Sequence, residues 1–170
     1  MKLNILWMEF QEEKKRKRIY TPQQAYLKAR GYCAYQERSQ QEVRNKIYEW
    51  GLKNEAVEDI IVKLITENFL NEERFAIAYA GGKFRIKQWG KIKIKQGLKL
   101  KSVSEYCIKK GLSTISDRDY LKTIREIIEE KSNTIKEKNP LKKNYKIAQY
   151  LISRGFESNL VWDVLKNDEF

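Results

Sequence analysis

The chain has 170 residues, of which 41% are hydrophobic and 12% aromatic, enough apolar material for a packed core. With only 2 prolines and 8 glycines it is poorly suited to many short strands and tight turns, so we expect an all-α fold. Its 35 Lys and Arg against 23 Asp and Glu give a formal net charge of +12, which predicts attraction to a polyanion such as a nucleic acid or an acidic protein.

Most enzyme chemistry is disfavoured by composition. The chain has no histidine, the commonest general base and zinc ligand. Cys33 and Cys107 stand alone and have the apolar neighbours of buried residues. No phosphate-binding loop or nucleophile elbow occurs, and the pair Glu72 and Glu73 fits the first turn of a helix better than a metal-dependent nuclease site. We therefore expect a protein that is not an enzyme and has no metal or cofactor.

The sequence pattern predicts neither a membrane span nor a secretory signal. No run approaches the roughly eighteen apolar residues of a membrane span, and the short apolar opening precedes acids and a basic cluster, the reverse of a secretory signal. We expect a cytoplasmic protein without membrane contact. Residues 1–21 are interpreted as a basic N-terminal arm that adds non-specific phosphate affinity, or as a disordered tail. Its cluster consists of Lys14, Lys15, Arg16, Lys17 and Arg18.

A first three-helix unit is predicted over residues 22–70. Pro22 suits a helix start, and an apolar stripe follows at helical spacing. Ser39 and Glu42 form a capping box for the second helix, in which hydroxyl and carboxylate satisfy two main-chain amides. The stripe consists of Ala25, Tyr26, Ala29, Tyr32 and Cys33.

A second unit is predicted over residues 71–116, opening at Asn71 with Phe75, Ala76, Tyr79 and Ala80 as its apolar stripe. Residues 91–101 alternate lysines with apolar residues around Gly97, which alone would indicate a β-hairpin. The repeat described below favours a helix there, because an isolated two-stranded ribbon would have no sheet to join.

The third unit is predicted over residues 117–170. Ser116 or Asp117 opens its first helix and Pro140 marks the entry to its second. The first helix carries Leu121, Ile124, Ile127 and Ile128 on one face, and the second supplies Tyr145, Ala148 and Leu151 or Ile152.

An internal repeat links the three units. Gly51, Ser102 and Gly155 lie 51 and then 53 residues apart, each after one helix and before an apolar residue, a polar cap and a new amphipathic helix. We expect Gly51 and Gly155 to have left-handed backbone conformations. A helix-turn-helix corner used three times predicts a solenoid of three three-helix repeats in which neighbouring units bury each other's faces.

Basic residues concentrate in the second unit. No acidic residue occurs from Arg74 to Ser104, and lysines recur every four residues from Lys83 to Lys99. Like charges at this spacing destabilise an isolated helix by about 0.2 to 0.5 kcal/mol per pair, which a polyanionic partner would relieve. Trp89 and Phe84 beside them are interpreted either as core or as groups that stack on bases or dock into a protein pocket. The candidate binding surface consists of Lys83, Arg85, Lys87, Trp89, Lys91, Lys93, Lys95, Lys99 and Lys101.

Three alternatives stay open at this point. The basic segment can be only a solvated face. The corners can belong to a sequence-specific DNA-binding regulator, although the second helices expose acids such as Glu55, Glu58 and Asp59 where base recognition needs Arg, Asn or Gln. A helical-repeat scaffold for an acidic protein would bind without DNA. No heptad is evident, so a monomer is expected.

Four stretches stand out along the first two units: Glu37-Arg38-Ser39 with Glu42 and Ile47, residues 69–76 (FLNEERFA), Trp89-Gly90, and the segment from Ile94 to Leu98. Together they resemble the successive signature stretches of the RecX family. The similarity covers about residues 22–116 well and the third unit more weakly, through Arg154-Gly155-Phe156. The chain departs from the family pattern at Asn71-Glu72, where Asp-Asp is common, and at Ser102, where glycine is usual.

This resemblance implies a bowed, elongated, right-handed array of three-helix repeats that lies along the groove of a RecA filament on single-stranded DNA. It further implies a non-enzymatic regulator that limits filament extension or promotes disassembly, and so modulates recombination, DNA repair and the SOS response.

Overall fold

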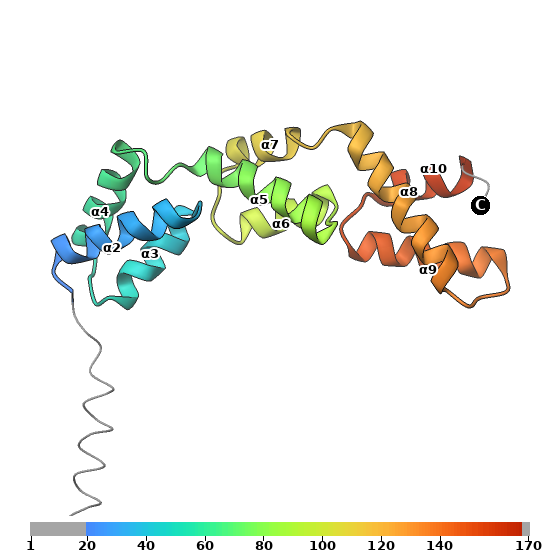
Figure 1. Cartoon of the computed structure of the whole chain (residues 1–170), viewed down its shortest axis with the longest axis horizontal. Coiled ribbons are helices and arrows are strands. Elements are labelled where there is room, and N and C mark those ends of the chain that lie inside the picture. Colours follow the sequence, from blue (N-terminus) through green and yellow to red (C-terminus); the bar gives the residue numbers. More distant parts are fainter. Residues whose placement is uncertain (1–19, 168–170) are drawn as a thin grey trace, which may run out of the picture. The chain divides into compact units, whose positions relative to one another are not determined.

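The computed structural model describes residues 20–167, and all the regular structure in that range is helical. Nine helices follow one another in the described residues, in three groups of three (Figure 1). The chain divides into two compact units, with the boundary after Leu70. The expected all-α fold of three-helix repeats is confirmed.

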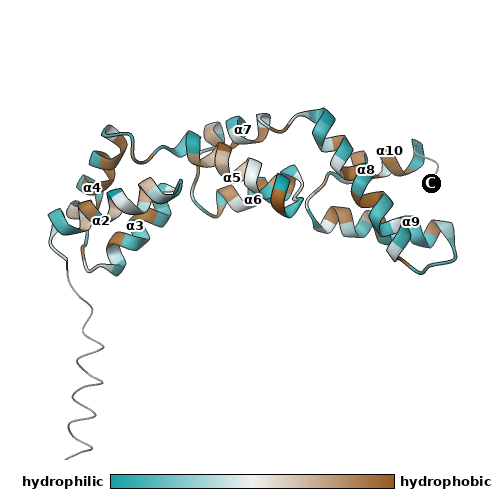
Figure 2. Ribbon diagram, in the orientation of Figure 1, coloured by the Kyte–Doolittle hydropathy of each residue, from teal (hydrophilic) through white to brown (hydrophobic). Residues whose placement is uncertain are grey.

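The first unit contains one repeat of three helices. They are α2 (Pro22–Tyr35), α3 (Gln40–Glu49) and α4 (Glu55–Thr66). All three contribute to a separate hydrophobic core, in which Ala25, Val43, Ile47, Val57 and Leu64 are fully buried. Hydrophobic and hydrophilic segments alternate along these helices, as expected when one face is buried (Figure 2).

The second unit contains the other two repeats. Its helices are α5 (Glu72–Lys87), α6 (Lys91–Lys99), α7 (Glu105–Ser113), α8 (Asp117–Thr134), α9 (Pro140–Ser153) and α10 (Ser158–Asn167). One continuous core extends from Phe75 to Leu165 and contains residues of all six helices. The second and third repeats therefore share their buried apolar surface.

Helix starts follow the local sequence closely. The Ser39 hydroxyl accepts a hydrogen bond from the Glu42 N–H, and the Glu42 carboxylate accepts one from the Ser39 N–H, so the predicted capping box is confirmed. Thr21 and Gln24 form the same arrangement before α2. Glu72 and Glu73 lie in the first turn of α5, where negative charge is favourable.

The three repeated corners share one backbone device. Gly51 and Gly155 have φ of 93° and 90°, which confirms the predicted left-handed conformation, and Ser102 occupies the equivalent turn with φ of 57°. After α9 the Phe156 N–H donates to the Leu151 carbonyl, and after α6 the Val103 N–H donates to the Leu98 carbonyl. Both turns thus end their helices with the bond from C″ to C3 that defines a Schellman motif.

The segment with period-two alternation forms helix α6, as the repeat predicted. Gly97 lies inside this helix on the side facing α5, and a Cβ there would collide with the Tyr79 hydroxyl. The glycine thus leaves room for the Tyr79 side chain against α6, although it lowers the helix propensity of this segment. One stripe residue was predicted wrongly: Tyr145 is 57% exposed, whereas Ile147, Ala148 and Leu151 supply the buried face of α9.

Candidate nucleic-acid interface

All nine residues predicted for the binding surface lie in the second repeat. Lys83, Arg85 and Lys87 are on the last turns of α5, and Trp89 is in the turn that follows. The remaining five lysines lie on α6 or directly after it. The basic cluster of residues 14–18 lies outside the described residues.

Three lysines form a row along one face of α6. Lys91, Lys95 and Lys99 are four residues apart, and each is ion-paired with a carboxylate from a later helix. The Lys91 ammonium is 2.9 Å from Asp117 Oδ1. Glu105 serves the other two, with Oε1 2.6 Å from Lys99 and Oε2 3.4 Å from Lys95. We call these three residues the lysine row. Their ion pairs with Asp117 and Glu105 relieve part of the repulsion between the three ammonium groups, and the sequence analysis did not predict these pairs.

Glu105 is held in this position by its place in α7. It is the first residue of that helix, where a negative side chain complements the helix dipole. The hydrogen bond from Lys99, with the positive charge of both lysines, lowers the pKa of Glu105 below its usual value. The carboxylate therefore stays ionised and continues to neutralise the row.

A second set of basic residues lies against aromatic rings. The Lys83 ammonium is 5.3 Å from the Tyr79 ring centroid and 4.9 Å from that of Trp89. The Lys93 ammonium lies 5.1 Å from the Trp89 centroid, and that of Lys101 lies 5.9 Å from the Tyr79 centroid. These distances are typical of cation–π contacts. We call Tyr79, Lys83, Trp89, Lys93 and Lys101 the aromatic face.

Trp89 packs as the core interpretation predicted, and its stacking on bases stays a prediction. Its partly buried indole packs against the shared core, while two lysines lie over its ring. Phe84 is 8% exposed and belongs to the core. Arg85 and Lys87 are exposed at the end of α5, and the Arg85 guanidinium lies over Gly81, where a Cβ would come within 2.9 Å of its nitrogens.

The start of α6 is fixed by the third repeat. The N–H of Gly90 donates to the Arg154 carbonyl over 2.9 Å, and the N–H of Ile92 donates to the Gly155 carbonyl over 3.1 Å. The Arg154 guanidinium donates in return to the Lys87 carbonyl. These bonds tie the turn before α6 to the turn between α9 and α10.

Tyr120 on α8 completes this junction. Its hydroxyl accepts a hydrogen bond of 2.8 Å from the Lys91 N–H and donates one of 2.6 Å to Glu157. The ring lies between Phe84 and Phe156, with centroids 5.8 and 5.2 Å away. Burial, with the bond to Glu157, raises the pKa of Tyr120. Sequence reasoning assigned no role to Tyr120 or Glu157, because only the tertiary fold brings them to α6.

The third repeat also carries an aromatic residue with two cations over its ring. Tyr150 on α9 has the Lys131 ammonium 4.6 Å from its ring centroid and the Arg154 guanidinium carbon 5.9 Å away. Lys131 is also ion-paired with the adjacent Glu130 over 2.8 Å. None of these residues was predicted to bind, because the third unit is nearly balanced in charge.

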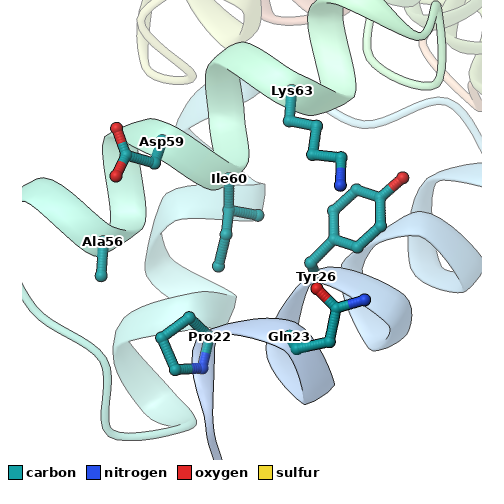
Figure 3. Close-up of a pocket in the computed structure, with 7 residues that line it drawn as sticks. All are labelled: Pro22, Gln23, Tyr26, Ala56, Asp59, Ile60 and Lys63. Carbon is teal, nitrogen blue, oxygen red and sulfur yellow. The ribbon is translucent and has the colours of Figure 1, made fainter.

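The first unit has a shallow pocket between α2 and α4 (Figure 3). Its volume of about 210 Å³ is below the range of about 300 to 1,000 Å³ usual for small-molecule sites. The Lys63 ammonium lies 4.0 Å from the Tyr26 ring centroid, and the Tyr26 hydroxyl donates to Glu67. None of the predicted surface residues lines this pocket.

The described part of the chain carries neither a metal-binding cluster nor a membrane-spanning helix. No group of three or more Cys, Asp or Glu side chains is placed to hold a metal ion within residues 20–167. Over the same residues, no helix combines the length and apolar character needed to cross a bilayer. Cys33 and Cys107 are both buried, as their neighbours predicted.

A tandem three-helix repeat protein with a basic second repeat is the class that this fold and surface define. Family models for the first, second and third three-helix domains of RecX match residues 25–64, 71–112 and 118–165. The chain therefore belongs to the RecX family.

Named relatives agree with this assignment. The chain is 31% identical to the regulatory protein RecX of Clostridium acetobutylicum, over 83% of this chain and 68% of the relative. It is also 31% identical to that of Clostridium perfringens and 24% identical to that of Bacillus mycoides, over 78% and 82% of this chain. It spans 64% and 52% of those two relatives' lengths.

Solved structures show the same fold. The crystal structure of RecX from Lactobacillus salivarius matches with a TM-score of 0.79 at 23% identity, covering 86% of this chain and 95% of that one. A crystal structure of a regulatory protein RecX matches with a TM-score of 0.75 at 21% identity, covering 86% of this chain and 74% of the other.

Proposed function

We propose that this chain is a regulatory protein that binds the RecA filament on single-stranded DNA and limits its extension or promotes its disassembly. The observation that carries this proposal is the match of all three repeats to RecX domains, with relatives named as regulatory proteins. In this role the protein acts without catalysis, as a cytoplasmic monomer, and modulates recombination and DNA repair.

The basic second repeat supports a polyanionic target. Nine Lys and Arg residues and no acid occur from Arg74 to Ser104, and α5 and α6 bring them to one repeat. Charges of this density give affinity for phosphates that depends on salt but not on base sequence. We propose that the predicted surface residues Lys83, Arg85, Lys87, Trp89, Lys91, Lys93, Lys95, Lys99 and Lys101 contact the DNA or RecA in the filament.

The alternative of a sequence-specific DNA-binding regulator is less well supported. The helices after the three corners, α4, α7 and α10, expose mainly acidic or mixed side chains. Glu55, Glu58 and Asp59 on α4 would repel phosphates and cannot read guanine edges as arginine does.

Co-sedimentation with RecA on single-stranded DNA, with RecA ATP hydrolysis measured in parallel, tests the proposal. We expect the protein to pellet with filaments, and filament length and hydrolysis to fall at stoichiometric amounts. Unchanged hydrolysis and filament length would refute the regulatory role. A pull-down with and without nuclease identifies a scaffold for an acidic protein, which would retain its partner after digestion.

A further inference from the structure

Helix α6 presents two basic faces with different partners. The lysine row on one side is held by Asp117 and Glu105. Lys93 points the other way, since two residues turn an α-helix by about 200°. Within residues 20–167 neither Lys93 nor Lys83 is ion-paired with a carboxylate; both lie over rings. A phosphate can reach these two ammonium groups without displacing an acid, whereas at the lysine row it competes with one.

The aromatic face continues into the third repeat. The Lys93 ammonium donates a hydrogen bond of 3.2 Å to the carbonyl of Ser153 at the end of α9. The next residue, Arg154, lies over Tyr150, and Lys131 lies over the same ring. Rings and cations thus alternate within each repeat, and two cations, Lys93 and Arg154, follow one another where the second repeat meets the third. Their order along this path is Lys101, Tyr79, Lys83, Trp89, Lys93, Arg154, Tyr150 and Lys131.

The junction between the repeats holds this path together. Arg154 is anchored by its guanidinium bond to the Lys87 carbonyl and by the bond that its own carbonyl accepts from Gly90. Both repeats share one core, so the two halves of the path belong to a single compact unit.

We propose that one strand of unpaired nucleic acid binds along this path, with phosphates on Lys83, Lys93 and Arg154 and bases against Trp89 and Tyr150. Alternating cations and aromatic rings are the pattern that binds single strands, because every base has a face that can stack while the cations follow the backbone. Duplex DNA would offer phosphates but not base faces. The inference rests on the proposed function and assigns its DNA contact to a face other than the lysine row.

Two double variants of the full chain test which face binds. K83Q/K93Q and K95Q/K99Q each remove two positive charges from the second repeat. Affinity for a labelled oligo(dT) is measured by fluorescence anisotropy over a range of salt concentrations. We expect K83Q/K93Q to lower the salt slope by about 1.4, at about 0.7 per single-strand phosphate contact. K95Q/K99Q should lower it by less than half as much. An equal or larger loss for K95Q/K99Q overturns the proposal.

The third-repeat contact is tested with two tyrosines of α9. Tyr150→Leu should weaken oligo(dT) binding about fivefold, the low end of the loss when a stacked base loses its aromatic partner. Tyr145→Leu, at an exposed position on the same helix, is the matched control and should have little effect. The wild type should also prefer oligo(dT) to an abasic oligomer of equal length, and Tyr150→Leu should reduce that preference. If both tyrosine variants behave alike, the extension into the third repeat is wrong.

Failure of this inference is distinguishable from failure of the proposed function. A wild-type protein with no affinity for oligo(dT) overturns the strand path, whatever RecA does. Co-sedimentation and ATP hydrolysis of RecA filaments then decide the regulatory role separately, since a regulator that contacts only RecA would still reduce both.

Discussion

The main-chain N–H of Gly90 donates a hydrogen bond of 2.9 Å to the carbonyl of Arg154, and Gly90 lies in backbone contact with Gly155. A Cβ at position 90 would collide with the Gly155 carbonyl group. Two glycines in the second and third repeats therefore let two turns approach more closely than side chains would permit. The orientation of α6 depends on this contact, because Gly90 is its N-cap.

Gly90→Ala should therefore destabilise the second unit. The added methyl group must displace backbone of the facing turn, and overpacking of this kind costs about 1 to 3 kcal/mol. Urea unfolding followed by circular dichroism measures the change. Gly82→Ala is the control, since a Cβ at that helical position meets nothing within 4 Å and should stabilise α5 by about 0.5 to 1 kcal/mol. Equal changes in the free energy of unfolding for Gly90→Ala and Gly82→Ala would contradict the proposal that the close approach of the Gly90 and Gly155 turns stabilises the second unit.

Tyr120→Phe should lower the free energy of unfolding by about 1 to 3 kcal/mol. The change removes the hydroxyl that joins the Lys91 N–H to the Glu157 carboxylate, and leaves both without this partner in a partly buried place. Tyr145→Phe, at an exposed position, is the control and should be nearly neutral. Thermal unfolding of both variants checks the difference.

The Tyr120 hydroxyl also leads us to predict that folding stability depends on pH in the alkaline range. A tyrosine in the unfolded chain ionises near pH 10, whereas burial and Glu157 raise the pKa of Tyr120 in the folded protein. The folded state then holds the Tyr120 proton more tightly than the unfolded chain does. The contribution of this hydroxyl to the free energy of unfolding is therefore complete below about pH 10 and is lost as pH rises further. The stability difference between wild type and Tyr120→Phe should therefore shrink above about pH 10; a difference that grows there would contradict this account.

Glu105→Gln should strengthen binding to oligo(dT) by about twofold to fivefold and increase its salt dependence, because the freed lysine row becomes an additional phosphate contact that the wild type, which binds through the aromatic face, lacks. The substitution releases Lys95 and Lys99 from the carboxylate that pairs with both, and exposed ion pairs of this kind are individually weak. Glu126→Gln makes the same charge change in the third repeat, where Glu126 pairs with Lys122, and controls for net charge. Anisotropy titrations that give the same affinity for the two variants would show that Glu105 does not limit the lysine row.

Ser102→Gly should stabilise the protein by about 0.5 to 1 kcal/mol. Ser102 has φ of 57° at the corner where the other two repeats have glycine, and a residue with a side chain is strained in that conformation. Ser113→Gly at the end of α7 should instead be destabilising, because glycine has low helix propensity. The midpoints of urea unfolding compare the two variants.

Local features were predictable from sequence and long-range contacts were not. The capping box at Ser39 and the left-handed glycines at Gly51 and Gly155 depend on a few neighbouring residues, and all three predictions are confirmed. The helical state of residues 91–99 needed the repeat, because their own alternation favoured a strand.

The arrangement of the predicted basic surface, in contrast, depends on long-range contacts. The basic residues from Lys83 to Lys101 were identified by charge alone, yet their division into two faces depends on Glu105 and Asp117, which come from later helices. Tyr150 and Arg154 join the path only because the turn after α9 packs against Gly90. No spacing in the sequence indicates that contact.

The two separate hydrophobic cores have a practical consequence for dissecting the molecule. A cut between Leu70 and Asn71 would leave each core cluster whole. A cut between α7 and α8 would instead divide a core to which both the second and third repeats contribute. The smallest fragment that retains the aromatic face with its extension and its anchoring junction is therefore residues 71–170, not an excised second repeat.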